Sequence, residues 1–314
     1  MRVLVTGAAG FIGSHVVEIL VSKGYEVIGV DDLSTGSLDN VEHLASSFKL
    51  IVDDITSPSR VTNYLREVDA VIHLAAIASV DECRDNPCRA TLVNVYGTVS
   101  MLHLALRLKA KHFIYASSAA VYGVPQRVPV SEDHPTNPLN VYGATKLAGE
   151  LLSLATAREK GLRCCILRIF NAYGPRMRRG GYASVVYRFT RAILRSEPMI
   201  IQGDGSQTRD FIYVKDVARA FLAALEARAE GVYNIGSGIE VSIRELADLV
   251  NSVAKSLGLK PVGIVYASPR PSDTPRSCAS IDKAVRELGW KPQVRLADGL
   301  RETLKWALER VLMY

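Results

Sequence analysis

Tyr142 and Lys146 are the two residues of this 314-residue sequence whose types and spacing most directly suggest chemistry. Residues four places apart share one face of a helix, so a helix from about Tyr142 onward would bring the phenol and the ammonium together. A nearby cation lowers the pKa of a tyrosine from about 10 and lets the phenolate take a proton from an alcohol. Because Tyr-x-x-x-Lys arises by chance in many exposed helices, the rest of the chain must show whether this pair forms an active site.

A glycine-rich turn near the N-terminus predicts a dinucleotide site. The β-rich run of residues 2–6 is followed by Gly7, Gly10 and Gly13, and then by an amphipathic pattern over residues 11–23. Strand, glycine turn and helix in this order open a Rossmann unit, and backbone N–H groups at the helix N-terminus bind the pyrophosphate.

Two acidic residues indicate which dinucleotide is bound. Asp31 and Asp32 follow a second expected strand, about two dozen residues after Gly7. A carboxylate at this place meets the adenosine ribose hydroxyls and repels a 2′-phosphate. We therefore expect NAD rather than NADP.

Strand and helix patterns alternate as far as residue 169, which predicts a doubly wound parallel α/β sheet. Ligands bind such sheets at the carboxyl ends of the strands, where Leu74–Ala76 leave room for a cofactor and Ser117 and Ser118 follow a strand. His73, alone at a strand end, reads as a structural hydrogen-bonding residue. The expected strands are residues 2–6, 26–30, 50–52, 70–73, 112–116 and 163–169, with a helix at 87–109 that carries Asn94 and another from about 142.

The pattern changes after Ile169 and predicts a smaller α/β domain that binds the substrate. Ser242 and Glu245 form a capping-box pattern at the start of a helix. We expect a Rossmann domain of residues 1–170, to which 206–236 return, and a second domain of residues 171–205 and 237–314. The expected parts of the second domain are a crossover to residue 182, a helix at 183–196, a strand at 199–202, a turn-rich segment at 203–210, a loop at 268–273 and a helix at 297–312. A helix at 214–227 and a strand at 232–235 are expected to return to the first domain.

Composition argues against nucleic acid and membrane partners. The net charge of +6 comes from scattered basic residues, and the densest cluster, Arg176, Arg178 and Arg179, suits a small anion as well as it suits DNA. No apolar run approaches the ~18 residues of a membrane helix and no signal peptide is apparent, so we expect a cytoplasmic protein. Five cysteines show no metal-ligand spacing; we expect reduced thiols and no metal, although Cys83 and Cys88 could pair.

Several motifs together resemble the extended short-chain dehydrogenase/reductase superfamily. Within it the chain is similar to the nucleotide-sugar epimerases of the UDP-glucose (UDP-galactose) 4-epimerase type, over its whole length. The motifs are TGAAGFIGSH at the start, SSAAVYG from Ser117, YGATK from Tyr142, RIFNAYGP from Arg168, GDGSQTRDFIYVKDVA from Gly203 and LGWKP from Leu288.

The resemblance implies roles for particular residues. Tyr142, Lys146 and Ser118 would be catalytic: the phenolate takes the proton of the sugar 4-hydroxyl while NAD takes the hydride, and the 4-keto sugar turns before both return. In the cofactor site it implies Gly7, Gly10, Phe11, Ile12, Gly13, Asp31, Asp32, Asp54, Ile55, Leu74, Ala75, Ala76, Asn94, Ser117, Tyr142, Lys146 and Phe170. In the UDP-sugar site it implies Ser118, Asn171, Val185, Gln202, Arg209, Arg270 and Asp273, and it implies a homodimer.

Several alternatives stay open. The sugar could be a UDP-hexose, a UDP-N-acetylhexosamine, which a small Ser277 would admit, or a UDP-uronic acid, whose carboxylate could meet the arginine cluster. A 4,6-dehydratase needs an Asp-Glu pair after Ser118, where this chain has Ala119 and Ala120. A dinucleotide-sensing binding protein would have no need of the catalytic residues.

Overall fold

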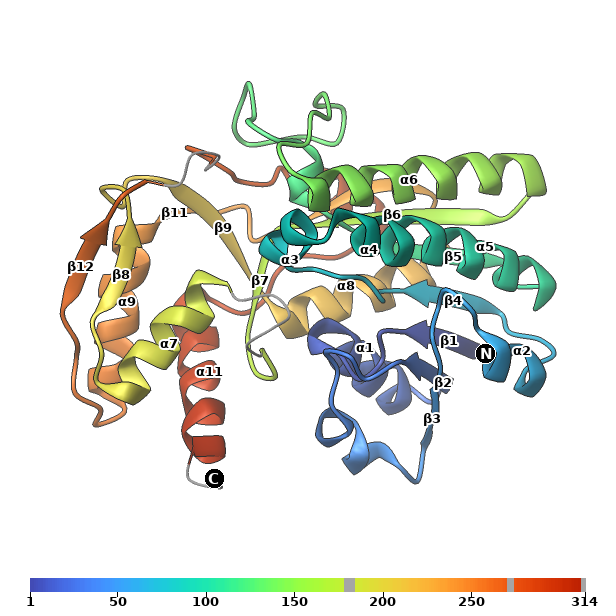
Figure 1. The fold of residues 1–314 in the computed structure, drawn as a ribbon, viewed down its shortest axis with the longest axis horizontal. Helices are drawn as coiled ribbons and strands as arrows, with labels where there is room; N and C mark the ends of the chain where they lie inside the picture. The colour runs from blue at the N-terminus through green and yellow to red at the C-terminus, as the bar shows by residue number, and fades with distance from the viewer. Residues whose placement is uncertain (178–183, 270–273, 312–314) are drawn as a thin grey trace.

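The central element of the computed structural model is a sheet of seven strands, and the structure describes residues 1–177, 184–269 and 274–311 (Figure 1). All of its strand pairs are parallel, and the order is β10-β6-β5-β4-β1-β2-β3. This confirms the predicted doubly wound sheet, and the strand order reverses between β1 and β4, where ligands bind in such folds. The strands are β1 (Arg2–Thr6), β2 (Glu26–Asp31), β3 (Phe48–Val52), β4 (Ala70–His73), β5 (His112–Ser118), β6 (Arg163–Ile169) and β10 (Gly231–Ile235).

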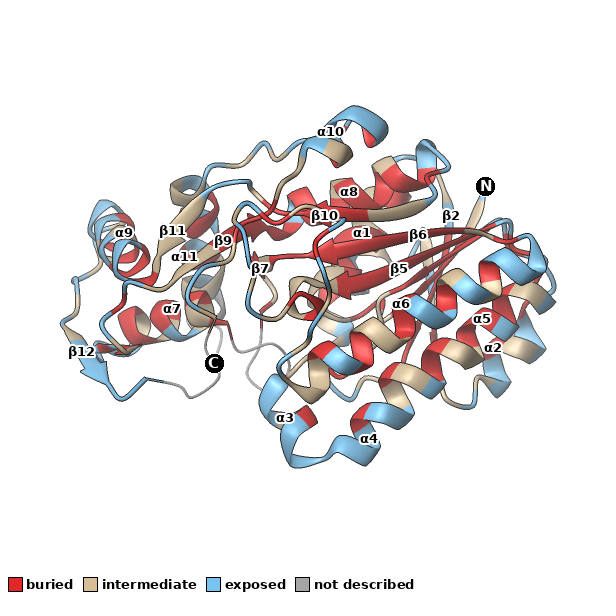
Figure 2. Ribbon diagram, turned by 90° about the horizontal axis from the view of Figure 1, so that it is seen from above, coloured by how far each residue is buried: buried red, intermediate tan, exposed pale blue. Residues whose placement is uncertain are grey.

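Helices cover both faces of the sheet, so its strands are mostly apolar on both faces. Side chains alternate between the two faces. Val3 and Val5 therefore pack into the core beneath α1 (Phe11–Ser22) and α8 (Val214–Glu226), and Leu4 packs into the core on the opposite face. That opposite face is covered by α5 (Gly97–Arg107) and α6 (Val141–Lys160) (Figure 1). Figure 2 shows β5 and β6 as buried strands, with exposed residues on the outer sides of these two helices.

A smaller lobe lies beyond the carboxyl ends of the strands, at the left of Figure 1. A third core holds it together, built around buried residues such as Phe189, Leu246 and Leu300. The division of the chain into two domains at these residue numbers stays a prediction. The elements of the lobe are α7 (Val185–Arg195), α9 (Ile243–Ser256), α11 (Leu296–Val311), a sheet of β7 (Asn171–Tyr173), β9 (Thr208–Tyr213) and β11 (Glu240–Ser242), and the pair β8 (Met199–Gln202) and β12 (Ile264–Ala267).

The structure corrects two expectations and settles one point that the sequence left open. The helix expected at 87–109 is interrupted: α4 (Pro87–Thr91) is followed by a π-helical segment, η3 (Leu92–Tyr96), before α5 begins. The segment 203–210 is not all turn, because β9 begins at Thr208 and pairs with β11. Cys83 and Cys88 do not pair, since all five cysteines are free thiols.

Local sequence signals explain where several helices begin. Asn140 caps α6 by accepting a hydrogen bond from the backbone N–H of Gly143 at 2.9 Å. Ser242 and Glu245 form the predicted capping box at the start of α9. Three short helices were not predicted from the sequence: α2 (Ser59–Tyr64), α3 (Val80–Asp85) and α10 (Asp282–Leu288).

None of the helices in the described part of the chain combines the length and the hydrophobicity that a bilayer crossing requires. Within residues 1–177, 184–269 and 274–311, no group of three His, Cys, Asp or Glu side chains is placed to bind a metal ion.

Candidate active site

A large cleft, about 1250 Å³ in volume, is lined by residues at the carboxyl ends of the central strands and by residues of the smaller lobe. It brings together most residues that the sequence singled out. The predicted residues that line it are Gly7, Gly10, Phe11, Ile12, Gly13, Asp31, Asp32, Asp54, Ile55, Leu74, Ala75, Ala76, Ser117, Ser118, Tyr142, Lys146, Phe170, Asn171, Gln202 and Arg209. Arg270 and Asp273 lie outside the described residues.

The glycine turn leaves no space for side chains, as a phosphate cradle requires. A Cβ atom on Gly13 would lie 1.9 Å from the carbonyl oxygen of Gly7. Gly7 has a φ of +68°, and a Cβ on it would lie 2.8 Å from the backbone nitrogen of Ala75. The turn and the residues after β4 therefore approach each other backbone to backbone, and the N-terminus of α1 stays open to an anion. This shape fits the pyrophosphate of NAD.

Asp31 lies where the adenosine ribose of a dinucleotide would be expected. Its carboxylate accepts hydrogen bonds from the backbone N–H groups of Ala9 and Leu33, both at 2.9 Å. Burial raises the pKa of Asp31, and these two donors act against that rise. Asn40, which the sequence analysis did not single out, also lines the cleft and donates to the carbonyl oxygen of Ala9 at 2.9 Å.

Two buried polar residues support the cleft from below. His73 contacts the hydroxyls of Thr6 at 2.7 Å and Thr98 at 3.1 Å, which confirms its predicted structural role. Asn94 does not line the cleft. Its Oδ1 accepts from the backbone N–H of Ile77 at 2.7 Å, and its Nδ2 donates to Thr145 Oγ1 at 3.0 Å. The side chain therefore joins the π-helical segment to α6, a contact that no local sequence signal could have shown.

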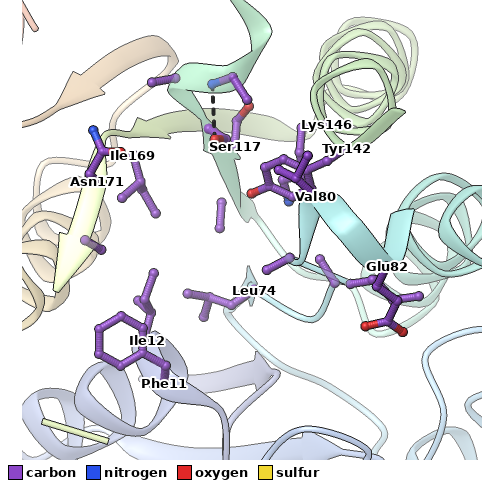
Figure 3. Close-up of a pocket in the computed structure, with 18 of the residues that line it drawn as sticks. Phe11, Ile12, Leu74, Val80, Glu82, Ser117, Tyr142, Lys146, Ile169 and Asn171 are labelled. Carbon is purple, nitrogen blue, oxygen red and sulfur yellow. Dashed lines mark hydrogen bonds between the residues drawn. The ribbon is translucent and has the colours of Figure 1, made fainter. Parts of the chain in front are cut away.

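Tyr142 and Lys146 extend from the first turns of α6 into the cleft, opposite Phe11 and Ile12 (Figure 3). Lys146 is only 3% exposed, and its Nζ lies 4.4 Å from the centre of the Tyr115 ring. Burial lowers the pKa of Lys146 to about 7, while the charge of Glu150 raises it. The lysine can therefore change its charge near neutral pH.

Ser118 ends β5 and lines the same cleft. Its Oγ accepts a hydrogen bond from the backbone N–H of Ala120 at 3.2 Å. A hydroxyl carries one donor, so the Ser118 O–H can still donate to another oxygen in the cleft. Ala119 and Ala120 also line the cleft and carry no group that could transfer a proton.

The smaller lobe contributes polar groups to the other end of the cleft. Arg209 Nη1 donates to the carbonyl oxygens of Thr208 and Thr274, both at 2.6 Å. Asn171 Nδ2 donates to the carbonyl oxygen of Asp210 at 3.0 Å. A second cavity of about 200 Å³ is lined by Arg209, Asn171, Gln202 and Val185, so Val185 lies beside the cleft and not in its wall.

Two further residues of the smaller lobe line the cleft. Arg176 contacts Glu18 of α1 across the two parts of the molecule, with Nη2 3.2 Å from Oε2. Arg176 belongs to the basic cluster noted in the sequence, and the other two arginines of the cluster, Arg178 and Arg179, lie outside the described residues. Ser277 lines the cleft as well, as a small side chain in its wall.

A Rossmann sheet whose cleft combines a Tyr-x-x-x-Lys helix with a serine at the preceding strand end defines an extended short-chain dehydrogenase/reductase. Comparison with known proteins agrees. The family model described as GDP-mannose 4,6 dehydratase matches residues 4–303. The chain belongs to this family.

Individual relatives span the full chain. The UDP-glucose 4-epimerase of Mycolicibacterium smegmatis is 39% identical, over 98% of each chain. UDP-glucuronic acid decarboxylase 1 of Arabidopsis thaliana is 36% identical, over 99% of this chain and 71% of its own length.

Solved structures show the same fold. The UDP-glucose 4-epimerase of Thermotoga maritima with UDP-glucose has a TM-score of 0.91 and 37% identity, over 99% of this chain and 100% of that one. The UDP-glucuronic acid 4-epimerase of Bacillus cereus, in complex with UDP-glucuronic acid and NAD, has a TM-score of 0.91 and 33% identity over the same shares.

Proposed function

We propose that this protein is an NAD-dependent 4-epimerase of a UDP-hexose that interconverts UDP-galactose and UDP-glucose. The observation that carries the proposal is the convergence of Tyr142, Lys146 and Ser118 in one cleft with the glycine turn. Its relatives and structural neighbours act on UDP-sugars, and the neighbour from Bacillus cereus holds NAD.

NAD fits the residues of the first domain. The glycine turn would hold its pyrophosphate, Asp31 its adenosine ribose, and Asp54 and Ile55 its adenine. When bound, NAD would supply the hydride acceptor for oxidation of the sugar at C4, and its reduced form would supply the hydride donor for the return step. The other predicted cofactor residues line the same cleft, except for Asn94, which we propose acts through Thr145 on α6.

The chain's own residues would move the proton. The Tyr142 phenolate takes the proton of the sugar 4-hydroxyl and later returns it to the same oxygen. The Lys146 ammonium stabilises the phenolate by its charge, and the Ser118 hydroxyl donates a hydrogen bond to the reacting oxygen. No other acid or base is needed at C5 or C6.

The smaller lobe would hold the nucleotide. Arg209 suits phosphate oxygens because a guanidinium presents several donors in one plane, and Asn171 lies in the same wall. Gln202 and Val185 line the adjoining cavity, which suits the base. Arg270 and Asp273 are proposed for the diphosphate and the ribose. Binding energy spent on the nucleotide leaves the sugar free to turn between the two half-reactions.

The identity of the sugar is the most specific part of the proposal. Ser277, a small residue in the cleft wall, also admits an N-acetyl group, so a UDP-N-acetylhexosamine is a second substrate to test. A UDP-uronic acid would bring a carboxylate toward Arg176, but this side chain is already paired with Glu18. We therefore favour a neutral hexose.

Dehydration and decarboxylation on the same fold are the competing reactions. The dehydratases and the decarboxylases both carry an acidic residue directly after the serine that corresponds to Ser118. Ala119 and Ala120 occupy these places and line the cleft, so the groups for elimination are missing there. A dinucleotide-sensing protein without activity is disfavoured because all three catalytic residue types are present in one cleft.

We also propose that the protein is a cytoplasmic homodimer. Leu92, Tyr96 and Leu151 are 51%, 54% and 60% exposed, and they lie on the adjacent segments η3 and α6. Apolar side chains exposed together mark protein interfaces. Five free thiols suit a reducing compartment. Sedimentation analysis of the protein and of the double variant Tyr96→Glu, Leu151→Arg measures the oligomeric state. The unmodified protein should sediment as a dimer and the double variant as a monomer.

The decisive experiment is product analysis. The purified protein is incubated, without added NAD, with UDP-glucose, UDP-galactose, their N-acetyl counterparts and UDP-glucuronic acid. Interconversion at C4 of the neutral hexoses is the expected result. A 4-keto-6-deoxy product, a pentose product, or no turnover of any substrate by protein with bound NAD would overturn the proposal.

A further inference from the structure

A buried ion pair lies one helical turn beyond Lys146. Glu150 of α6 is 1% exposed and Arg168 of β6 is 6% exposed. Arg168 Nη2 lies 2.7 Å from Oε2 of Glu150, and Nε lies 3.0 Å from Oε1. Ser117 Oγ also donates a hydrogen bond to Oε1. Because removing two charges from water is costly, such a pair is weak evidence for stability alone and calls for another explanation.

The pair is held at the edge of the active site. Ser117 and Arg168 face each other in the register of β5 and β6, immediately before Ser118 and Ile169, which both line the cleft. The Arg168 guanidinium also lies 4.8 Å from the centre of the Tyr122 ring. The Glu150 carboxylate therefore has a fixed position relative to the catalytic end of the sheet.

Burial keeps the neighbours of Lys146 on other elements neutral near pH 7, apart from the Arg168 cation. It raises the pKa of Cys83 to about 11 and lowers the pKa of His73 to about 3. It also raises the pKa of Tyr115. Among the described residues, the titratable or charged groups that face Lys146 and Glu150 are Cys83 of α3, His73 of β4, Tyr115 of β5, Cys164 and Arg168 of β6 and Tyr142 of α6.

We propose that Glu150 is the counter-charge of Lys146, a positioning residue that Arg168 and Ser117 hold in place and that keeps the lysine charged beside Tyr142. Opposite charges four residues apart on a helix attract, and the attraction is stronger away from water. Of the charged groups, Glu150 has the largest effect on the pKa of Lys146, and it raises that pKa against burial. The inference rests on the proposed roles of Tyr142 and Lys146 in proton transfer.

Titration of Lys146 itself tests the inference without any sugar. Trace acetylation by acetic anhydride, followed by mass spectrometry of the Lys146 peptide, reports the fraction of neutral amine at each pH. For the purified protein with its cofactor, the midpoint is expected below that of an exposed lysine, because the side chain is buried. Glu150→Gln is expected to lower it by about one pH unit, because the charged form loses its counter-ion. Glu150→Asp, which keeps the charge, should restore most of the difference.

Glu159→Gln is the matched control, since it removes the same charge from an exposed position of the same helix and should leave the midpoint unchanged. If Glu150→Gln does not fold, the double variant Glu150→Gln, Arg168→Gln leaves no unpaired buried charge and should also lower the midpoint. The inference would be overturned if the titration midpoint of Lys146 were unchanged in folded Glu150→Gln. It would also be overturned if Glu150→Gln and Glu150→Asp shifted that midpoint equally. Failure to turn over UDP-sugars would contradict the proposed function and leave this result standing.

Discussion

The backbone N–H of Ala9 donates a 2.9 Å hydrogen bond to Oδ2 of Asp31. This contact joins the glycine turn after β1 to the carboxyl end of β2, so the two sequence signals for a dinucleotide form one structure. The carboxylate therefore both shapes the turn and presents a negative charge to the site.

Replacing Asp31 should change both the affinity and the choice of cofactor. In Asp31→Asn we expect at least about tenfold weaker NAD binding, because a hydrogen-bonded carboxylate is lost, and weaker discrimination against NADP, because the repulsion of a 2′-phosphate is lost. Equilibrium binding of both dinucleotides measures this. Glu26→Gln, at the exposed start of the same strand, is the control and should bind NAD normally. If Asp31→Asn bound NAD with unchanged affinity, the adenosine ribose would not be bound by Asp31.

Gly13 should not tolerate a methyl group. The Cβ of Gly13→Ala would lie 1.9 Å from the Gly7 carbonyl oxygen, so the turn must move. We expect a loss of about 1–3 kcal/mol in the free energy of unfolding, together with loss of bound NAD. Urea denaturation measures the first quantity. Gly263→Ala, where no atom lies within 4 Å of the added Cβ, should be neutral, and equal effects at both positions would refute the explanation.

Tyr142→Phe removes the proposed base and little else. Loss of positioned acid–base catalysis lowers kcat by about 10²- to 10⁴-fold, while KM for the UDP-sugar and the amount of bound NAD should stay near those of the unmodified protein. Steady-state kinetics and cofactor absorbance measure these. Tyr64→Phe, at an exposed position of α2, is the matched control. Activity retained in Tyr142→Phe would mean that another group moves the proton.

Lys146 should make stability depend on pH in the alkaline range. Its pKa falls from 10.5 to about 7 on folding, so between these values the unfolded chain binds a proton that the folded protein does not. Stability relative to Lys146→Met therefore rises with pH across this window and is level below it. Urea denaturation of both proteins from pH 6 to 10 measures the difference. Two parallel stability curves would show that the lysine is not desolvated as described.

Local patterns were enough to predict the strands of the central sheet, the glycine turn and the Tyr142 helix. Gly7 and Gly13 were recognisable because a tight turn depends on a few consecutive residues. The π-helical segment that carries Asn94 was not recognisable, because it depends on contacts with Ile77 and with Thr145 across 51 residues of sequence. The strand β9 was hidden for the same reason, since its partner β11 lies about 30 residues further on.

The sequence by itself determined the class of fold, the dinucleotide turn and the spacing that puts Tyr142 and Lys146 on one helix face, because each depends on short-range geometry. Only the tertiary structure decided what surrounds that pair. Glu150, Arg168 and Ser117 meet from three separate elements, and burial, which no short pattern reveals, brings the pKa of Lys146 to about 7. Long-range packing sets the local dielectric, and the dielectric sets how strongly these charges act on one another.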